Sequence, residues 1–196
     1  MIDARPVTAE DAARLVDLFD AAGSACFCRW LSFTGDKNDW LMRCAQAPAE
    51  NRRELEEGLR DGRADTLGVV AVEGEALVGW MKVAPALVTP KAYEQRFYRA
   101  LPCLGGPREG VFLIGCALVH PGARRRGIAT ALVGAAVALA RSRGARAIEA
   151  LPRRPRGIAE RDEELWTVPV AALEAHGLTV VGGEDPYPVM RRELAS

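Results

Sequence analysis

The sequence predicts one mixed α/β domain in which helices pack against a twisted β-sheet. Stretches with helical spacing alternate with short apolar stretches that are typical of strands. The chain has 196 residues, of which 49% are hydrophobic, enough for one large core. It contains neither an internal repeat nor a low-complexity linker, so we expect residues 1–196 to form a single domain.

The first third of the chain is expected to be helical. Residues 8–11 read Thr-x-x-Asp, close to a capping box, and they begin a helix that Gly23 ends. Residues 38–46 form a second, short helix. Pro48 suits the first turn of a third helix, which Gly62 ends.

The middle of the chain predicts a hairpin and then a central strand. The segments 66–73 and 76–85 are strand-like, and the Gly-Glu pair between them makes a tight turn. Residues 89–101 could form a helix, although their clustered aromatic residues leave this open. Residues 110–119 are almost entirely apolar and are the best candidate for a buried central strand.

The last third alternates between helix and strand. Ile128, Leu132 and Leu139 lie on one stripe of a helix that Gly144 ends. We then expect a strand, a polar loop, a helix and a closing pair of strands, over residues 146–152, 153–164, 167–177, 178–183 and 187–194.

Charge and composition exclude several classes of function. Lys and Arg together number 26, as do Asp and Glu, so the net charge predicts neither a nucleic-acid nor a membrane partner. No apolar run is long enough to span a bilayer. The first residues include acids where a signal peptide would be basic and then apolar, so we expect a cytoplasmic protein.

The cysteine pattern predicts neither disulfides nor a metal site. The number of cysteines is odd, and no C-x-x-C pair occurs. Only His120 and His176 could join cysteines as metal ligands, so a structural zinc site is not expected. The five cysteines are Cys26, Cys28, Cys44, Cys103 and Cys116.

The junction at residues 124–130 has the features of an anion site. Three arginines run into Gly127, at the point where the helix begins. The start of a helix offers unpaired backbone N–H groups and a positive dipole, and glycine allows a phosphate to approach closely. A solvated basic helix start is the alternative. The P-loop and the G-x-G-x-x-G patterns are both absent from this segment.

At this junction the chain resembles the GNAT superfamily of acyl-CoA N-acyltransferases. Their signature [QR]-x-x-G-x-[GA] reads here RRRGIA, residues 124–129, after the prelude ALVHPGA. The match is close over residues 110–151, and the order of elements agrees over most of the chain. The resemblance implies a mixed, mostly antiparallel twisted sheet with a central splay, and acetyl-CoA or a related acyl-CoA as the acyl donor.

The resemblance also implies roles for single positions. Backbone N–H groups of residues 125–130 would hold the pyrophosphate, and the end of the central strand would pair with the pantetheine arm in a gap beside residues 147–151. An N–H near Leu118 or Val119 could polarise the thioester carbonyl. The implied cofactor-binding residues are Ala117, Leu118, Val119, Arg124, Arg125, Arg126, Gly127, Ile128, Ala129 and Thr130.

A weaker resemblance concerns the segment CFCRW, which is similar to a bacterial GNAT subgroup with a C-x-C-x-W segment near its N-terminus. It implies that Cys26, Cys28 and Trp30 line the acceptor side of the cleft, together with Trp80 of the hairpin. Core packing is the alternative for all four, and we slightly favour it.

The acid and the base of the reaction are less well defined. Many GNAT members use a tyrosine four residues before the glycine that ends the last helix, but here this position is Leu173. His176 lies near this position, but a residue beside a helix-ending glycine is usually structural. Tyr187 and Tyr93 are alternatives without positional support.

Glu149 is the first candidate for the base. It sits in an apolar strand that should face the splay, and a buried carboxylate there could accept a proton. It could instead face outward or pair with an arginine, and Glu109 is a second candidate. A run of arginines after this strand could approach the 3′-phosphate of CoA or an acidic acceptor, namely Arg153, Arg154 and Arg156.

The resemblance therefore implies an N-acetyltransferase that moves an acetyl group from acetyl-CoA to a primary amine by direct attack in a ternary complex. The acceptor would be a small molecule or a peptide amine, and a homodimer is possible. A non-catalytic CoA-binding or regulatory module of the same fold is the alternative, because of Leu173. A nucleotide-binding protein that uses the same anion site is a third possibility.

Overall fold

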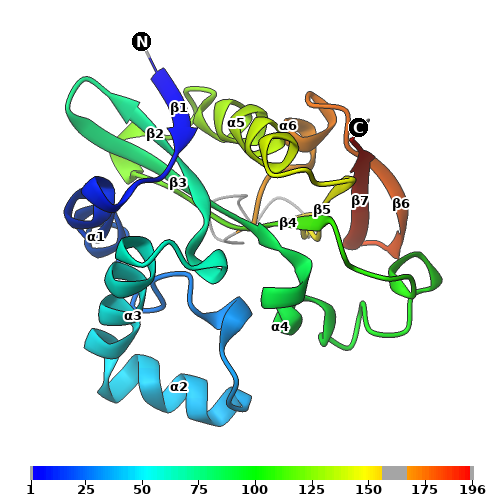
Figure 1. Ribbon diagram of the computed structural model, residues 1–196, viewed down its shortest axis with the longest axis horizontal. Coiled ribbons are helices and arrows are strands. Elements are labelled where there is room, and N and C mark those ends of the chain that lie inside the picture. The colour runs from blue at the N-terminus through cyan, green and yellow to red at the C-terminus, as the bar shows by residue number, and fades with distance from the viewer. Residues whose placement is uncertain (1, 156–166, 195–196) are drawn as a thin grey trace.

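The computed structural model describes residues 2–155 and 167–194. Within them, seven strands form one sheet in the order β1-β2-β3-β4-β5-β7-β6 (Figure 1). The strands are β1 (Ile2–Pro6), β2 (Gly68–Glu73), β3 (Ala76–Pro85), β4 (Val111–Val119), β5 (Ala147–Ala150), β6 (Thr179–Glu184) and β7 (Tyr187–Glu193).

The sheet is mostly antiparallel and parts at its centre. Among the described strands only β4 and β5 pair in parallel, and they do so from Val111↔Ala147 to Ile114↔Ala150. Beyond Ile114, β4 continues to Val119 beside β3. No described strand pairs with residues 115–119 of β4 on the side away from β3. This confirms the mixed, mostly antiparallel sheet, and the parting between β4 and β5 corresponds to the expected central splay.

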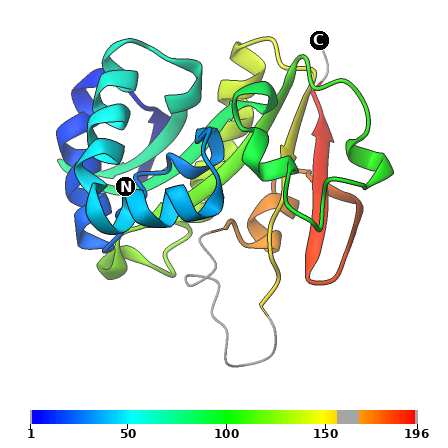
Figure 2. The ribbon, with the colours of Figure 1, turned by 90° about the horizontal axis from the view of Figure 1, so that it is seen from below.

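Helices cover both faces of the sheet (Figures 1 and 2). On one face, α5 and α6 pack over a core that includes Val83, Leu132 and Ile148. On the opposite face, α1 and α3 pack over Trp80 and its neighbours, and α2 packs against α3. The helices are α1 (Ala12–Ala21), α2 (Lys37–Gln46), α3 (Pro48–Arg60), α4 (Pro90–Tyr93), α5 (Ile128–Ser142) and α6 (Val170–Glu174).

Local sequence explains where several elements begin and end. The Asp36 carboxylate accepts hydrogen bonds from the backbone N–H groups of Asn38 and Asp39, which caps α2. Pro48 occupies the first turn of α3. In the β2–β3 turn Gly74 has a φ of 60°, a conformation that favours glycine.

Two elements differ from expectation. The sequence analysis did not predict β1, because a short edge strand in which charged residues interrupt the apolar ones lacks a clear strand pattern. The possible helix over residues 89–101 is reduced to the four residues of α4. Tyr93 and Tyr98 of this segment pack instead into a small core on the face opposite α5, whereas Phe97 is exposed.

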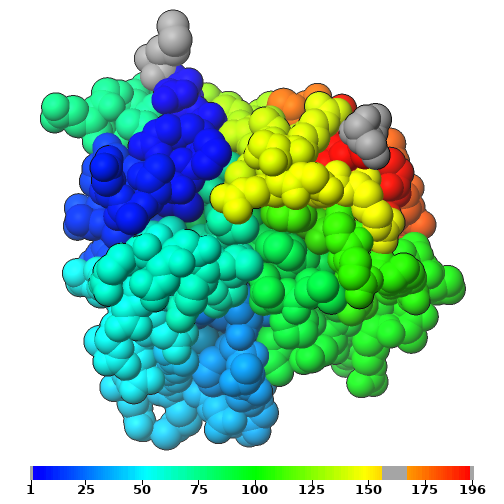
Figure 3. Space-filling model, viewed as in Figure 1, coloured from blue at the N-terminus to red at the C-terminus, as the bar shows by residue number. Residues whose placement is uncertain are grey.

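The surface view shows how the N-terminal helices and the segment between β3 and β4 share one face (Figure 3).

Within residues 2–155 and 167–194, no helix combines the length and apolar character needed to cross a bilayer. The same described residues contain no group of His, Cys, Asp or Glu side chains suited to hold a metal ion.

Candidate acyl-donor site

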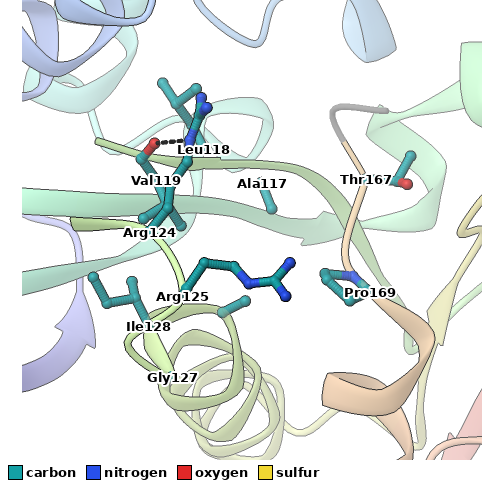
Figure 4. A pocket seen from close by; sticks show the side chains of 10 residues that line it. Ala117, Leu118, Val119, Arg124, Arg125, Gly127, Ile128, Thr167 and Pro169 are labelled. Carbon is teal, nitrogen blue, oxygen red and sulfur yellow. Dashed lines mark hydrogen bonds between the residues drawn. The ribbon is translucent and has the colours of Figure 1, made fainter. Parts of the chain in front are cut away.

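A cavity of about 310 Å³ lies where the free end of β4 meets the start of α5 (Figure 4). The start of α6 and the residues just before it close a third side. The cavity therefore joins parts of the chain that are far apart in sequence. Its lining is Ala117, Leu118, Val119, Arg124, Arg125, Gly127, Ile128, Ala129, Thr167 and Pro169.

The free edge of β4 presents backbone groups to this cavity. The N–H of His120 donates to the carbonyl of Val78 on β3 at 2.9 Å. Backbone groups alternate along a strand, so Leu118 also faces β3, whereas Ala117 and Val119 direct their N–H and C=O groups to the open side. The Val119 carbonyl accepts a hydrogen bond from Nε of Arg124 at 3.4 Å. The edge can therefore pair with an extended ligand.

The start of α5 provides the second wall. Gly127 precedes the helix with a φ of 77°, and it offers no side chain to cap the first N–H groups. The first N–H to bond back along the helix is that of Ala131, which donates to the Gly127 carbonyl at 3.0 Å. A Cβ built on Gly127 would meet no described atom within 4 Å. An anion can therefore reach unpaired N–H groups at the positive end of the helix.

The three arginines of the junction point in different directions. Arg124 and Arg125 line the cavity, and in Figure 4 the Arg125 side chain extends across it toward Pro169. Arg126 instead pairs with the Glu73 carboxylate on β2, with one contact at 3.0 Å. The Arg126 side chain is therefore engaged away from the cavity, and the expected role of its backbone N–H stays a prediction. Thr130 does not line the cavity either.

A family model described as the acetyltransferase (GNAT) family matches residues 36–159, more than half of the chain. The chain belongs to the GNAT acetyltransferase family. Comparison with curated protein sequences finds no match.

Solved structures share the GNAT fold along the full chain. PaiA N-acetyltransferase from Thermoplasma acidophilum, in complex with coenzyme A, is 11% identical with a TM-score of 0.55, and 99% of each chain is covered. A GNAT family acetyltransferase from Brucella melitensis, in complex with acetyl-CoA, is 18% identical with a TM-score of 0.52, covering 100% of this chain and 90% of that one. Ribosomal-protein-alanine N-acetyltransferase from Brucella melitensis is 16% identical with a TM-score of 0.54, and the match covers 98% of this chain and 99% of that chain. At these identities the similarity shows a shared fold.

Thr167 and Pro169 of this GNAT chain line the cavity, although the sequence analysis assigned them only to the start of a helix. The Thr167 hydroxyl accepts a hydrogen bond from the backbone N–H of Arg153 at 3.4 Å. Nothing local in the sequence marks these residues, because they reach the cavity only through the packing of α6 against α5.

The residues expected to line the acceptor side lie on the sheet face opposite α5. Trp80 and Cys28 are 1% and 2% exposed, and Nε1 of Trp80 donates to Sγ of Cys28 at 3.2 Å. Both residues belong to the core, which is the alternative that the sequence analysis slightly favoured, and they do not line the acceptor side. Cys26 and Trp30 are partly exposed, and Trp30 packs against Trp40 with ring centroids 5.5 Å apart.

Glu149 does not line the cavity beside β4, where its role as the base would have placed it. Its side chain is buried and accepts hydrogen bonds from the Tyr93 hydroxyl at 3.0 Å and from Arg191 at 2.5 Å. It borders a separate cavity of about 360 Å³ beside Arg108 and Arg146. The expectation left open an ion pair with an arginine, and the structure contains that pair.

The alternative acids are engaged in packing. Leu173 is fully buried in the core beneath α5, and the His176 imidazole packs against α5, with its Cε1 atom 2.8 Å from where a Cβ on Gly134 would be. Burial raises the pKa of Tyr93, and the nearby Glu149 carboxylate raises it further. Tyr187 stacks on Phe97 with ring centroids 3.8 Å apart.

The arginines after β5 are only partly described. Arg154 pairs with Asp185 at 2.6 Å, an exposed contact. Arg153 has its backbone contact with Thr167 beside the cavity. Arg156 lies outside the described residues.

Proposed function

We propose that this GNAT protein acts as a single-domain N-acetyltransferase that moves an acetyl group from acetyl-CoA to a primary amine by direct attack in a ternary complex. The acceptor is a small-molecule or peptide amine. The observation that carries the proposal is the cavity in which an uncapped helix start meets a free strand edge.

The start of α5 fits the pyrophosphate of the donor. The N–H groups that follow Arg124 have no acceptor within the helix, and the dipole of α5 adds positive potential at the same point. The Arg124 and Arg125 side chains border this position and add two positive charges. Charge-assisted hydrogen bonds to phosphate are about twice as strong as neutral ones, so we expect this wall to supply much of the affinity.

The free edge of β4 fits the pantetheine arm. Ala117 and Val119 offer backbone donors and acceptors in the alternation that an added strand requires. Acetyl-CoA supplies the acetyl group as a reactive thioester. Because the N–H of Val119 points to the open side and that of Leu118 points to β3, we assign polarisation of the thioester carbonyl to Val119.

In this proposal Glu149 holds β5, α4 and β7 together and does not transfer a proton. Both of its carboxylate oxygens already accept hydrogen bonds, from α4 and from β7. Its place beside a second cavity separates it from the groups that would contact the donor.

A non-catalytic CoA-binding module is the second candidate, and the buried Leu173 at the family tyrosine position favours it. The two candidates differ in turnover. Incubation of the protein with acetyl-CoA and a panel of primary amines, followed as release of free thiol, should give amine-dependent turnover. Tight binding of acetyl-CoA without thiol release for any amine would favour the module.

A matched pair of glycine variants tests the donor site. Gly127 and Gly144 flank α5, have φ values of 77° and 71°, and would each meet no described atom with an added Cβ. A glutamate at either position carries the same left-handed strain of about 1–2 kcal/mol. We expect Gly127→Glu to weaken acetyl-CoA binding by at least about a hundredfold in calorimetry, because its carboxylate competes for the anion site.

Gly144→Glu is the control and should keep wild-type affinity at a similar loss of stability. Unchanged affinity in Gly127→Glu would remove the anion site. Equal loss in both variants would assign the effect to helix stability.

A further inference from the structure

Three cysteine thiols gather on the sheet face opposite the acyl-donor cavity. Cys26 and Cys28 lie in the turn before the short helical turn Trp30–Ser32, and Cys116 lies on β4 directly before Ala117. Cys26 and Cys28 are separated by Phe27 alone, and the Cys116 and Cys26 thiols both contribute to the raised pKa of Cys28. The proposed acetyl transfer uses none of these groups.

The turn that carries Cys28 is held from several sides. Nε1 of Trp80 donates to Sγ of Cys28 at 3.2 Å. Nζ of the buried Lys82 donates to the Cys28 carbonyl at 3.1 Å and to the Asp65 carbonyl at 2.6 Å. Phe27 and Cys28 have φ values of 43° and 51°, so the backbone folds back tightly between the two thiols. The pair is therefore held together in one compact turn.

Cys26 has the features of a reactive thiol. It is partly exposed, and its Sγ lies 3.3 Å from the Ser24 hydroxyl. The neighbouring Cys28 thiol lowers the pKa of Cys26 to about 6, helped by the Ser24 hydroxyl, the Cys28 backbone N–H and the Lys82 charge. Burial raises the pKa of Cys28. One partner is thus a thiolate near neutral pH, and the other remains a thiol.

We propose that Cys26 is a modification site for hydroperoxides and that its oxidised form closes a disulfide with Cys28. In the first step the Cys26 thiolate forms an S–O bond as the peroxide O–O bond breaks, and the departing hydroxide or alkoxide takes a proton from solvent and leaves as water or an alcohol. In the second step the Cys28 sulfur attacks that of Cys26. The S–S bond forms, the S–O bond breaks, and the Cys28 proton leaves with the hydroxyl group as water. Two electrons pass from the thiols to the peroxide.

Alkylation with iodoacetamide tests the reactivity of Cys26 without reference to activity. At pH 6 we expect Cys26 to react roughly tenfold faster than Cys44 or Cys103, because its larger thiolate fraction outweighs the lower nucleophilicity of a low-pKa thiolate. The pKa values of Cys44 and Cys103 are both raised, chiefly by burial. Alkylation of the urea-unfolded chain gives the reference rate of each cysteine without the fold. Equal alkylation rates for Cys26, Cys44 and Cys103 in the native protein would overturn the proposal.

A pair of serine variants separates the hydroxyl contact from a general effect of substitution. Ser24→Ala should slow alkylation of Cys26 at pH 6, because it removes a hydrogen bond to the thiolate. Ser32→Ala is the control, since its hydroxyl has no partner in the described structure, and it should leave the rate unchanged.

Hydrogen peroxide tests the disulfide. Peptide mapping of the treated wild-type protein should show a Cys26–Cys28 crosslink that dithiothreitol reverses. In Cys28→Ser, dimedone should instead trap a sulfenic acid on Cys26. A peroxide-treated wild-type protein that keeps both thiols free, or that crosslinks a different pair first, would overturn the proposal even if Cys28→Ser fails to fold.

Discussion

The Glu149 carboxylate shows how one buried residue joins distant parts of this protein. It lies on β5 and accepts hydrogen bonds from Tyr93 of α4 and Arg191 of β7. Arg191 also reaches Glu193, which is 68% exposed. A buried ion pair of this kind holds elements in place, and loss of one partner leaves the other charge without compensation.

We expect Glu149→Gln to reduce the free energy of unfolding by about 3 kcal/mol, because the largely buried Arg191 loses its main partner. Glu193→Gln removes the exposed partner of the same arginine and should cost at most about 1 kcal/mol. Urea denaturation measures both. A large fall in kcat for Glu149→Gln at unchanged stability would instead assign this residue to proton transfer.

At the scale of elements, the position of α5 depends on a close approach to β3. A Cβ on Gly79 would lie 2.7 Å from Ile128 and 3.1 Å from Leu132, both in the first two turns of α5. Glycine at this position therefore lets the start of the helix rest directly on the sheet. The same turns form a wall of the acyl-donor cavity.

We expect Gly79→Val to weaken acetyl-CoA binding as well as stability, because the added methyl groups push the start of α5 away from β4. Overpacking of a core costs about 1–3 kcal/mol. Ala140→Val overpacks the far end of the same helix and should lower stability by a similar amount at unchanged affinity. Calorimetry on both variants checks this, and equal affinities would contradict it.

The sequence predicted elements with strong local patterns and missed those defined by packing. The uninterrupted apolar run of β4, the hairpin and the glycine at the start of α5 are local signals, and the structure contains all three. The orientation of the Arg126 side chain depends on Glu73, which lies far away in the chain, and it could not be predicted from the motif. The place of Thr167 and Pro169 in the cavity wall likewise could not be predicted, because it depends on the packing of α6 against α5.

At the scale of the whole molecule, acetyl-CoA should stabilise the fold by mass action. At about a hundred times its Kd, a ligand that binds only the folded state adds about 2.7 kcal/mol. For a chain of this size that is a rise in Tm of roughly 5 to 10 °C. ATP and NAD at the same concentration should leave Tm unchanged. A comparable shift with either nucleotide would favour a general nucleotide site.

The parallel seam between β4 and β5 has a mechanical consequence. Its four residue pairs are the only described strand pairing between the N-terminal and the C-terminal parts of the sheet. If acetyl-CoA lies along β4 as proposed, it would add backbone hydrogen bonds at the point where the β4–β5 pairing ends, and so would strengthen the link between the two parts of the sheet. Under the proposed function, the donor-bound protein would therefore resist opening of the sheet at its centre more than the donor-free protein does.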